Sequence, residues 1–323
     1  MSGAVSLKVR AELRDRARAA VGLALVIGLA GGLVIAAAAG ARRTSSAFEA
    51  FRKAQNTAQS GIANPAQAFG FATVDFDKAD RLPSVAESAR FSFFVGFVTT
   101  SRGTVLTMIG DRNPVVMFAS ADDRFDRTLN KMLVTEGRLS NPDAVDEVVA
   151  SYIAATSYGL RVGDTLDVRF PAFQDFEAGP SAQRLTGPRI RLRVVGIEAT
   201  SSELPPGLGY PPLHLTSAFF KRYVTQTPTF PADMVRLRAD SDIDGFEAAL
   251  QDAVVRTPGR DTSSRIQFFN EVSNARAIER TIHIQSVALW LLAALAGLAT
   301  VLILGQALVR EAFLGSQDHP ALR

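Results

Sequence analysis

The stretch TEGRLSNPDAVDEVVASYIAATSYGLRVGDTL, Thr135–Leu166, decides the fold class of the chain. An acidic pair precedes the apolar strand candidate DEVVAS, residues 146–151, and Gly163–Asp164 shapes a tight entry into a second strand candidate, DTLDVRF, residues 164–170. The helical run YIAATSYGL, residues 152–160, lies between them. Strand, helix and strand in quick succession predict a mixed module, and this spacing indicates no catalytic residue.

Short strand and helix patterns continue on both sides of this stretch, so we predict an α+β domain. Alternating or continuous apolar residues predict further strands at 68–76, 91–100, 104–110, 114–120, 189–199 and 234–240. Three segments have the start signals or spacing of helices: LPSVAESAR (82–90), SAFFKRYV (217–224) and GFEAALQDAV (245–254). Proline and glycine mark residues 201–212 as a loop.

Two uncharged apolar runs frame this domain, AAVGLALVIGLAGGLVIAAAAGA at 19–41 and VALWLLAALAGLATVLILGQAL at 287–308. As a helix, at about 1.5 Å per residue, each run can cross the hydrocarbon core of a bilayer, which is about 30 Å thick. Trp290 lies near the start of the second run, where an indole suits the membrane interface. A cleaved signal peptide is the alternative for the first run, but the apolar region of such a peptide is shorter. We therefore expect two transmembrane helices.

These spans divide the chain into five parts and predict a multi-pass protein of the cell membrane. The lysine and arginine bias around the spans is slight, and it favours a cytoplasmic N-terminus with the large domain outside. Helical patterns without proline or glycine extend the spans into the domain as stalks. The expected parts are a cytoplasmic N-terminus (1–18), a transmembrane helix (19–41), an extracytoplasmic α+β module (42–286) with stalk helices at about 44–60 and 267–286, a second transmembrane helix (287–308) and a cytoplasmic tail (309–323).

Composition and motifs argue against catalysis, metal binding and nucleic-acid binding. The chain has no cysteine and three histidines, His214, His283 and His319, which stand far apart in the sequence. HExxH, GxSxG and GxxxxGK[ST] motifs are absent, so we predict no catalytic, cofactor-binding or metal-ligating residue and no ATPase site. The net charge of +3 arises from interspersed charges, and one tryptophan and four tyrosines are available for base stacking, so no nucleic-acid partner is expected.

Residues 240–251, DSDIDGFEAALQ, begin with the acidic spacing of a calcium-binding loop. Asp240, Asp242 and Asp244 occupy the first, third and fifth positions, but Gln251 stands at the twelfth, where a bidentate carboxylate is required. The segment before this loop is also a strand candidate and not a helix. We therefore expect a strand-to-helix turn in which Asp242 or Asp244 caps the helix.

The central segment resembles a known family at several short motifs. Residues 136–168 are similar to the extracytoplasmic core module of MacB/FtsX-like ABC transporter permeases. In that module a Gly-Arg pair, a strand of the EVVVS type, a GLxVGD turn and a further strand follow one another. The matching residues are Gly137–Arg138, Glu147–Ser151, Gly159–Asp164 and Arg191–Ile197, and Gly40–Phe51 is similar to the segment after the first span of large permeases in this group. The shared order of span, stalk, module, stalk and span covers essentially the whole chain.

The resemblance implies a permease subunit and not an enzyme. Such a protein works with a cytoplasmic ABC ATPase and with further permease spans or a second permease copy in the lipid bilayer. It passes ATPase-driven movement through the stalk helices to the external domain, for export, lipoprotein extraction or activation of a partner outside. In this family the segment after the second span enters an LRALG-like motif that contacts the ATPase. Residues 320–323 read PALR, where that motif has only begun, so we expect the chain to be the N-terminal part of a larger permease. Partnership with the ATPase would then need the missing C-terminal part.

Two other classes of protein also place an external domain between two spans. A ligand sensor or receptor normally continues into a signalling module, and residues 309–323 are too few to form one. A membrane-anchored enzyme would need a catalytic constellation, and the motifs of this chain do not provide one.

Overall fold

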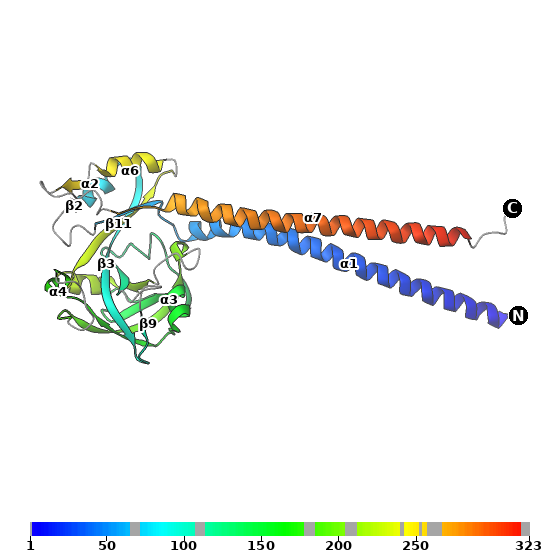
Figure 1. Cartoon of the computed structure of the whole chain (residues 1–323), viewed down its shortest axis with the longest axis horizontal. Coiled ribbons are helices and arrows are strands. Elements are labelled where there is room, and N and C mark those ends of the chain that lie inside the picture. The colour runs from blue at the N-terminus through cyan, green and yellow to red at the C-terminus, as the bar shows by residue number, and fades with distance from the viewer. Residues whose placement is uncertain are drawn as a thin grey trace. The chain divides into compact units, whose positions relative to one another are not determined.

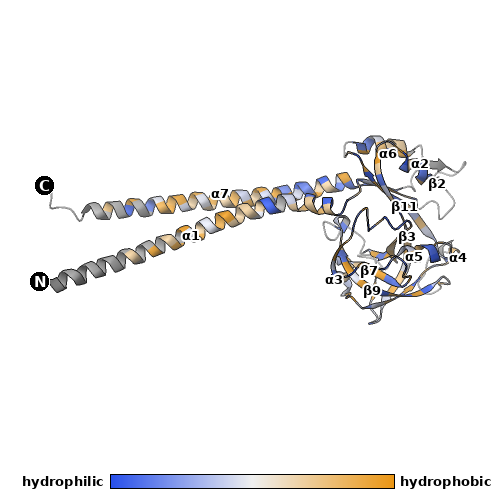
Figure 2. Ribbon diagram, turned by 180° about the vertical axis from the view of Figure 1, so that it is seen from behind, coloured by the Kyte–Doolittle hydropathy of each residue, from blue (hydrophilic) through white to orange (hydrophobic). Residues whose placement is uncertain are grey.

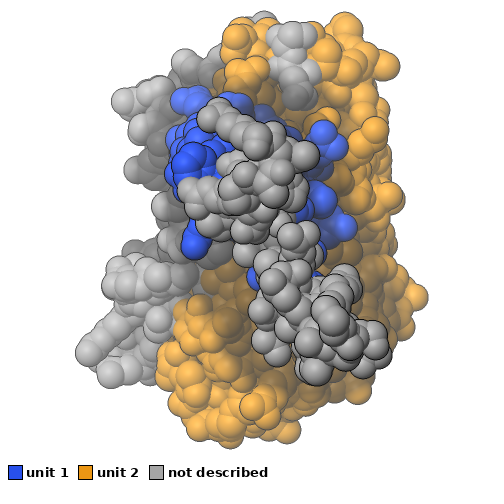
Figure 3. Space-filling model, turned by 90° about the vertical axis from the view of Figure 1, so that its right-hand side faces the viewer, with its two compact units in different colours: residues 1–48, 279–323 blue, residues 49–278 orange. Residues whose placement is uncertain are grey.

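The structure is a computed structural model that describes residues 2–64, 72–106, 114–177, 185–203, 212–239, 242–251, 254–256 and 267–317. The chain forms two compact units, one made of residues 1–48 with 279–323 and the other of residues 49–278 (Figure 1, Figure 3). The first unit contains most of the two long helices, and the second contains all the described strands.

Two long helices pack against each other in the first unit: α1, Ser2–Ala54, and α7, Glu271–Gln317. Ser286 Oγ on α7 donates a hydrogen bond to the carbonyl oxygen of Ala41 on α1 over 3.2 Å. A Cβ atom added at Gly297 would lie 3.9 Å from the nearest side chain of α1. Small residues at these positions let the two helix backbones come close together.

Within the part of the chain that the structure describes, one helix is long and apolar enough to cross a membrane: α7, over Glu271–Gln306. Hydrophobic residues are frequent along the middle of this helix in Figure 2. It contains nearly all of the run predicted as the second span, 287–308. The run predicted as the first span, 19–41, lies within α1, but several of its side chains are outside the description, so that span stays a prediction.

Six strands of the second unit close into a ring. Around the ring, β3 pairs with β5, β5 with β10, β10 with β7, β7 with β9, β9 with β8, and β8 with β3. All six contribute buried side chains, such as Phe94, Met117 and Leu192, to one hydrophobic cluster, which therefore fills the ring. The strands are β3 (Val85–Thr100), β5 (Val115–Ser120), β7 (Glu147–Ser151), β8 (Thr165–Arg169), β9 (Arg189–Ala199) and β10 (Leu213–Leu215).

The sheet extends beyond the ring because β3 is long enough to pair twice. Its first half pairs with β11 (Thr229–Leu237), which pairs with β1 (Ser60–Ala63), and β1 pairs with β13 (Gln267–Asn270). A second cluster that includes Ile62, Phe246 and Leu250 packs on this extension. The remaining elements are β4 (Val105–Leu106) beside β3, β6 (Leu133–Gly137) beside β9, the pair β2 (Ala72–Val74) and β12 (Val254–Arg256), and the helices α2 (Phe76–Asp80), α3 (Tyr152–Tyr158), α4 (Phe173–Glu177), η2 (Ser201–Glu203), α5 (Ser217–Tyr223) and α6 (Ile243–Gln251).

The helix predicted at LPSVAESAR, residues 82–90, is wrong, because residues 85–90 form the first part of β3. In the pairing with β11, Ser88 stands opposite Val235 and Arg90 opposite Asp233. Pairing with a strand about 145 residues later therefore overrides the local helix-start signals of proline and serine.

Both predicted stalks are shorter than expected at the end that meets the sheet. The stalk predicted at 44–60 ends with α1 at Ala54, because Asn56 adopts a left-handed φ of 51° and residues 60–63 form β1. The stalk predicted at 267–286 begins with α7 at Glu271, because residues 267–270 form β13. Asn270 Oδ1 accepts a hydrogen bond from the Ser273 backbone N–H (2.9 Å) at this helix start.

The structure confirms the α+β class and most of the predicted elements. The strand predicted at 189–199 is β9 residue for residue, and the elements predicted across residues 146–170 correspond to β7, α3 and β8. The strands predicted at 91–100 and 114–120 correspond to β3 and β5, and the helix at 217–224 corresponds to α5. The strand predicted at 234–240 overlaps β11, which ends at Leu237, and the helix predicted at 245–254 overlaps α6, which ends at Gln251, while Val254 lies in β12. The segments 68–76, 104–110 and 201–212 lie partly outside the described residues, which show β2, β4 and η2 in the remainder.

Candidate functional site

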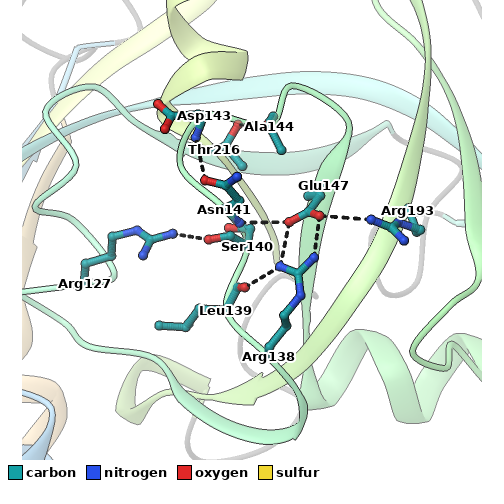
Figure 4. A network of polar contacts seen from close by, with 10 residues as sticks. All are labelled: Arg127, Arg138, Leu139, Ser140, Asn141, Asp143, Ala144, Glu147, Arg193 and Thr216. Atoms are coloured by element: carbon teal, nitrogen blue, oxygen red, sulfur yellow. Dashed lines mark hydrogen bonds and ion pairs between the residues drawn. The ribbon is translucent and has the colours of Figure 1, made fainter.

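The motif residues Arg138 and Glu147 form an ion pair in the second unit (Figure 4). Arg138 Nη1 donates to Glu147 Oε2 (2.8 Å) and Arg138 Nη2 donates to Glu147 Oε1 (2.5 Å), so the contact is bidentate. Arg193 Nη2 reaches the same Oε1 at 3.0 Å, and the Asn141 backbone N–H donates to Oε2 at 2.8 Å. The Arg138 hydrogen bonds lower the pKa of Glu147 to about 2, although its burial acts in the opposite direction.

Two glycines bring β6 and β9 close enough for this pair to form. Gly137 has a φ of 73°, in the left-handed region, and a Cβ added there would lie 2.3 Å from the Val195 carbonyl oxygen. A Cβ added at Gly196 would lie 2.2 Å from the Arg138 carbonyl oxygen. The glycine of the Gly-Arg motif is therefore required by the backbone geometry. It permits β6 to come close to β9, and Arg138 then reaches Glu147.

The second half of the motif shapes helix α3 and the turn that follows it. Ser151 Oγ accepts a hydrogen bond from the Ala154 backbone N–H (3.0 Å) as the N-cap, and Gly159 ends the helix with a left-handed φ of 64°. Asp164 Oδ2 accepts hydrogen bonds from the Arg161 backbone N–H and from Arg102 Nη2, each at 2.9 Å. These residues order the backbone, and their contacts give none of them a reactive position.

Residues 55–59, which follow α1, are bonded to the core on two sides, and we call them the α1 junction. The Gln55 carboxamide donates to the Ala199 carbonyl oxygen and accepts from the Ser201 backbone N–H, each at 2.9 Å. Asn56 Nδ2 donates to Glu87 Oε2 and to the Thr128 carbonyl oxygen, each at 2.9 Å. The end of α1 is therefore attached to β9, to β3 and to the loop before β6.

The start of α7 lies next to the α1 junction. Strand β1 follows the junction directly and pairs with β13, which directly precedes α7, so that Ser60 stands opposite Asn270. The Glu271 backbone N–H also donates to the Gln59 carbonyl oxygen over 2.9 Å. Both long helices therefore join the sheet at one pair of neighbouring strands.

A buried polar cluster lies next to residues 199–201, which Gln55 of the α1 junction contacts. We call its four ionisable residues, Asp126, Glu198, Glu203 and His214, the buried acid cluster. His214 Nδ1 lies 2.7 Å from Asp126 Oδ2, and His214 Nε2 lies 3.1 Å from Glu198 Oε1. Burial alone would lower the pKa of His214, but the two carboxylates raise it well above its usual value. Burial, with the neighbouring Glu198 charge, raises the pKa of Glu203 to about 7, and burial also raises the pKa of Glu198.

The other histidines and the acidic loop lie elsewhere. His283 is on α7, and His319 lies outside the described residues. Asp244 is in the first turn of α6 and Gln251 is its last residue, while Asp240 is also outside the description. Across the described ranges, no group of three or more histidine and acidic side chains is arranged to hold a metal ion.

Two solved structures are similar to this one. The chain is similar to the periplasmic region of MacB from Actinobacillus actinomycetemcomitans, with 12% identity and a TM-score of 0.38, over 71% of this chain and 95% of that one. It is also similar to the extracellular domain of the noncanonic ABC-type transporter YknZ from Gram-positive bacteria, with 11% identity and a TM-score of 0.34, over 65% and 98%. By these descriptions, both are parts of their proteins that lie outside the cytoplasm. No protein-family model and no curated protein matches the sequence.

The sequence motifs single out Gly137, Arg138 and Glu147, but they predict neither the ion pair nor the α1 junction nor the buried acid cluster. Gln55 and Ser201 are 146 residues apart, and Asp126 and His214 are 88 residues apart. A glutamine after a helix and a lone histidine in a strand are common in soluble domains, so these residues carry no local signal. The folding of β9, β10 and η2 brings them together.

Proposed function

We propose that this chain is a permease subunit of an ABC transporter in the cell membrane, with residues 49–278 as its extracytoplasmic domain. The carrying observation is that α1 and α7 both join the domain at the paired strands β1 and β13. Each helix also continues without interruption from residues of the first unit into residues of the second. Movement of the two helices would therefore act directly on one pair of strands, which suits a domain driven from the membrane.

The proposed partners are a cytoplasmic ABC ATPase and further permease spans or a second permease copy in the bilayer. The motif residues support this class, because Gly137, Arg138 and Glu147 have the structural roles that a shared fold would require. The domain would transmit movement and not catalyse a reaction. Export, lipoprotein extraction and activation of a partner outside are all compatible with this transmission.

A cysteine at Ser101 should react with a membrane-impermeant maleimide on intact cells, because Ser101 is exposed in the turn after β3 and the domain is proposed to lie outside. The native chain has no cysteine, so each introduced thiol is the only one in the protein. Ser6→Cys should react only after the membrane is made permeable. Ser120→Cys is a matched control, because Ser120 is 6% exposed and should stay protected until the domain unfolds. Labelling of Ser6→Cys but not Ser101→Cys on intact cells would contradict the proposed topology.

The permease role predicts association with an ABC ATPase. The full chain, tagged and extracted from membranes of its source organism after mild cross-linking, should recover an ABC ATPase together with permease spans. Replacing Gln55 and Asn56 together with alanine should leave this recovery unchanged and reduce the transport or partner activation that depends on it, because these residues attach α1 to the core. Recovery of a signalling kinase in place of the ATPase would favour a sensor.

A further inference from the structure

The buried acid cluster holds more negative groups than it can neutralise. Its members come from four elements: Asp126 from the loop after β5, Glu198 from β9, Glu203 from η2 and His214 from β10. They are the charged groups that face one another there among the described residues, and each is at most 6% exposed. With three carboxylates and one imidazolium, full ionisation would leave two negative charges in excess.

An excess of buried charge is costly, so such a cluster takes up protons. The hydrogen bonding agrees with this: Glu198 Oε1 contacts His214 Nε2 at 3.1 Å, while Glu198 Oε2 and Glu203 Oε1 are buried without a hydrogen-bond partner in the described structure. Of the three carboxyl groups, Asp126 has the closest contact with His214, at 2.7 Å. Glu198 and Glu203 are therefore the groups whose ionisation the site supports least.

The α1 junction is bonded to the short segment that separates these two glutamates. The Gln55 carboxamide donates a hydrogen bond to the carbonyl oxygen of Ala199, the residue after Glu198. It also accepts one from the backbone N–H of Ser201, two residues before Glu203. Thr57 Oγ1 lies 3.3 Å from Ser201 Oγ in the same segment. Any displacement of residues 199–201 that follows ionisation of the glutamates must change these contacts.

We propose that proton uptake by the buried acid cluster controls how firmly the α1 junction is held in the domain, so that the attachment is tight in acid and loosens as the pH rises through neutrality. The consequence for transport rests on the proposed function, in which α1 carries movement. The attachment itself depends only on the contacts within residues 49–278.

The direction follows from the pKa values. The pKa of Glu203 is raised to about 7 from 4.5, so its contribution to stability is fully present below about pH 4.5 and is lost as the pH rises through 7. The pKa of His214 is raised above 6.5, so its contribution is present below pH 6.5 and is lost as the pH rises through the folded-state pKa. Both groups therefore weaken the folded arrangement as the pH rises.

Hydrogen exchange of the full chain in nanodiscs, followed by mass spectrometry, tests this inference. After correction for intrinsic exchange, amides of residues 55–59 should lose protection by on the order of tenfold between pH 5.5 and 8.0, because the Glu203 pKa lies within this range. Glu203→Gln, which is neutral at both pH values, should lose most of this pH response, so that its protection at pH 8.0 stays close to the acid level. Glu136→Gln on the exposed strand β6 is the matched control and should respond to pH as the native chain does.

Two outcomes would overturn the inference: equal protection of residues 55–59 at both pH values in the native chain, or an undiminished pH response in Glu203→Gln. If Glu203→Gln does not fold, Gln55→Ala provides the second test and should show low protection of residues 56–59 at both pH values, with β3 still protected. Failure to recover an ABC ATPase, with the pH response intact, would count against the proposed function and leave this inference standing.

Discussion

Gly196→Ala is expected to destabilise the domain formed by residues 49–278 by about 3 kcal/mol or more, the largest effect that we predict for a single substitution. The added Cβ would lie 2.2 Å from the Arg138 carbonyl oxygen, and backbone atoms cannot rotate away as a flexible side chain would. Strands β6 and β9 would have to separate, and this would also move Arg138 away from Glu147.

The measurement uses the absence of native cysteine. In a Ser120→Cys background of the full chain, the rate of thiol labelling in increasing urea reports opening of the buried strand β5. Gly245→Ala is the control, because nothing lies within 4 Å of the added Cβ and alanine in a helix is favoured by about 0.5–1 kcal/mol over glycine. Equal urea midpoints for the two variants would show that the close approach of β6 and β9 is not needed.

Glu147→Gln should produce the second-largest loss, about 2 kcal/mol at neutral pH, because one buried carboxylate serves two arginines and a backbone N–H. We take a value below that of a fully buried ion pair, because the side chains of Arg138 and Arg193 are 53% and 57% exposed and water screens their charges. The pKa of Glu147 is lowered from 4.5 to about 2, so its contribution is present above pH 4.5 and is lost as the pH falls through about 2. The difference between the native chain and Glu147→Gln should therefore shrink in strong acid.

Asp167→Asn is the matched control for this variant. Asp167 also contacts an arginine across neighbouring strands, with 3.4 Å between its Oδ1 and Arg191 Nε, but both side chains are more than half exposed. An exposed ion pair contributes about 0–1 kcal/mol, so the urea midpoint should change little. A similar loss in both variants, or a loss from Glu147→Gln that persists unchanged at pH 2, would contradict the role given to Glu147.

Local sequence patterns predicted an element well where the residues that define it lie within that element or beside it. Strand β9 alternates basic and apolar residues over 189–193, and it has one wet face in the folded domain, so its bounds follow from periodicity. Helix α3 lies within the predicted helical run 152–160, and its serine N-cap and glycine C-cap directly flank it in the sequence. Arg138 and Glu147 are nine residues apart, so the motif segments that contain them can be recognised within one short stretch of sequence.

Prediction failed where a distant segment supplied the hydrogen bonds. Residues 85–90 have helix-start signals before them, yet they form a strand because β11 pairs with five of these six residues. The short strands β1 and β13 were not predicted: the predicted stalk at 267–286 includes all of β13, and the stalk at 44–60 ends at the first residue of β1. Each is only four residues long and gains its stability from the other and from β11, which is information that no local window contains.

The apolar helix that can cross a membrane and the α+β class could be predicted from the sequence, because hydropathy and periodicity are set by residues close together in the chain. Where α1 and α7 join the sheet, and which ionisable groups are buried together, became visible in the folded structure alone. The physical reason is that pairing and burial depend on the partner: Gln55 acquires its role from Ser201, and His214 from Asp126 and Glu198, only when strands far apart in the chain become neighbours.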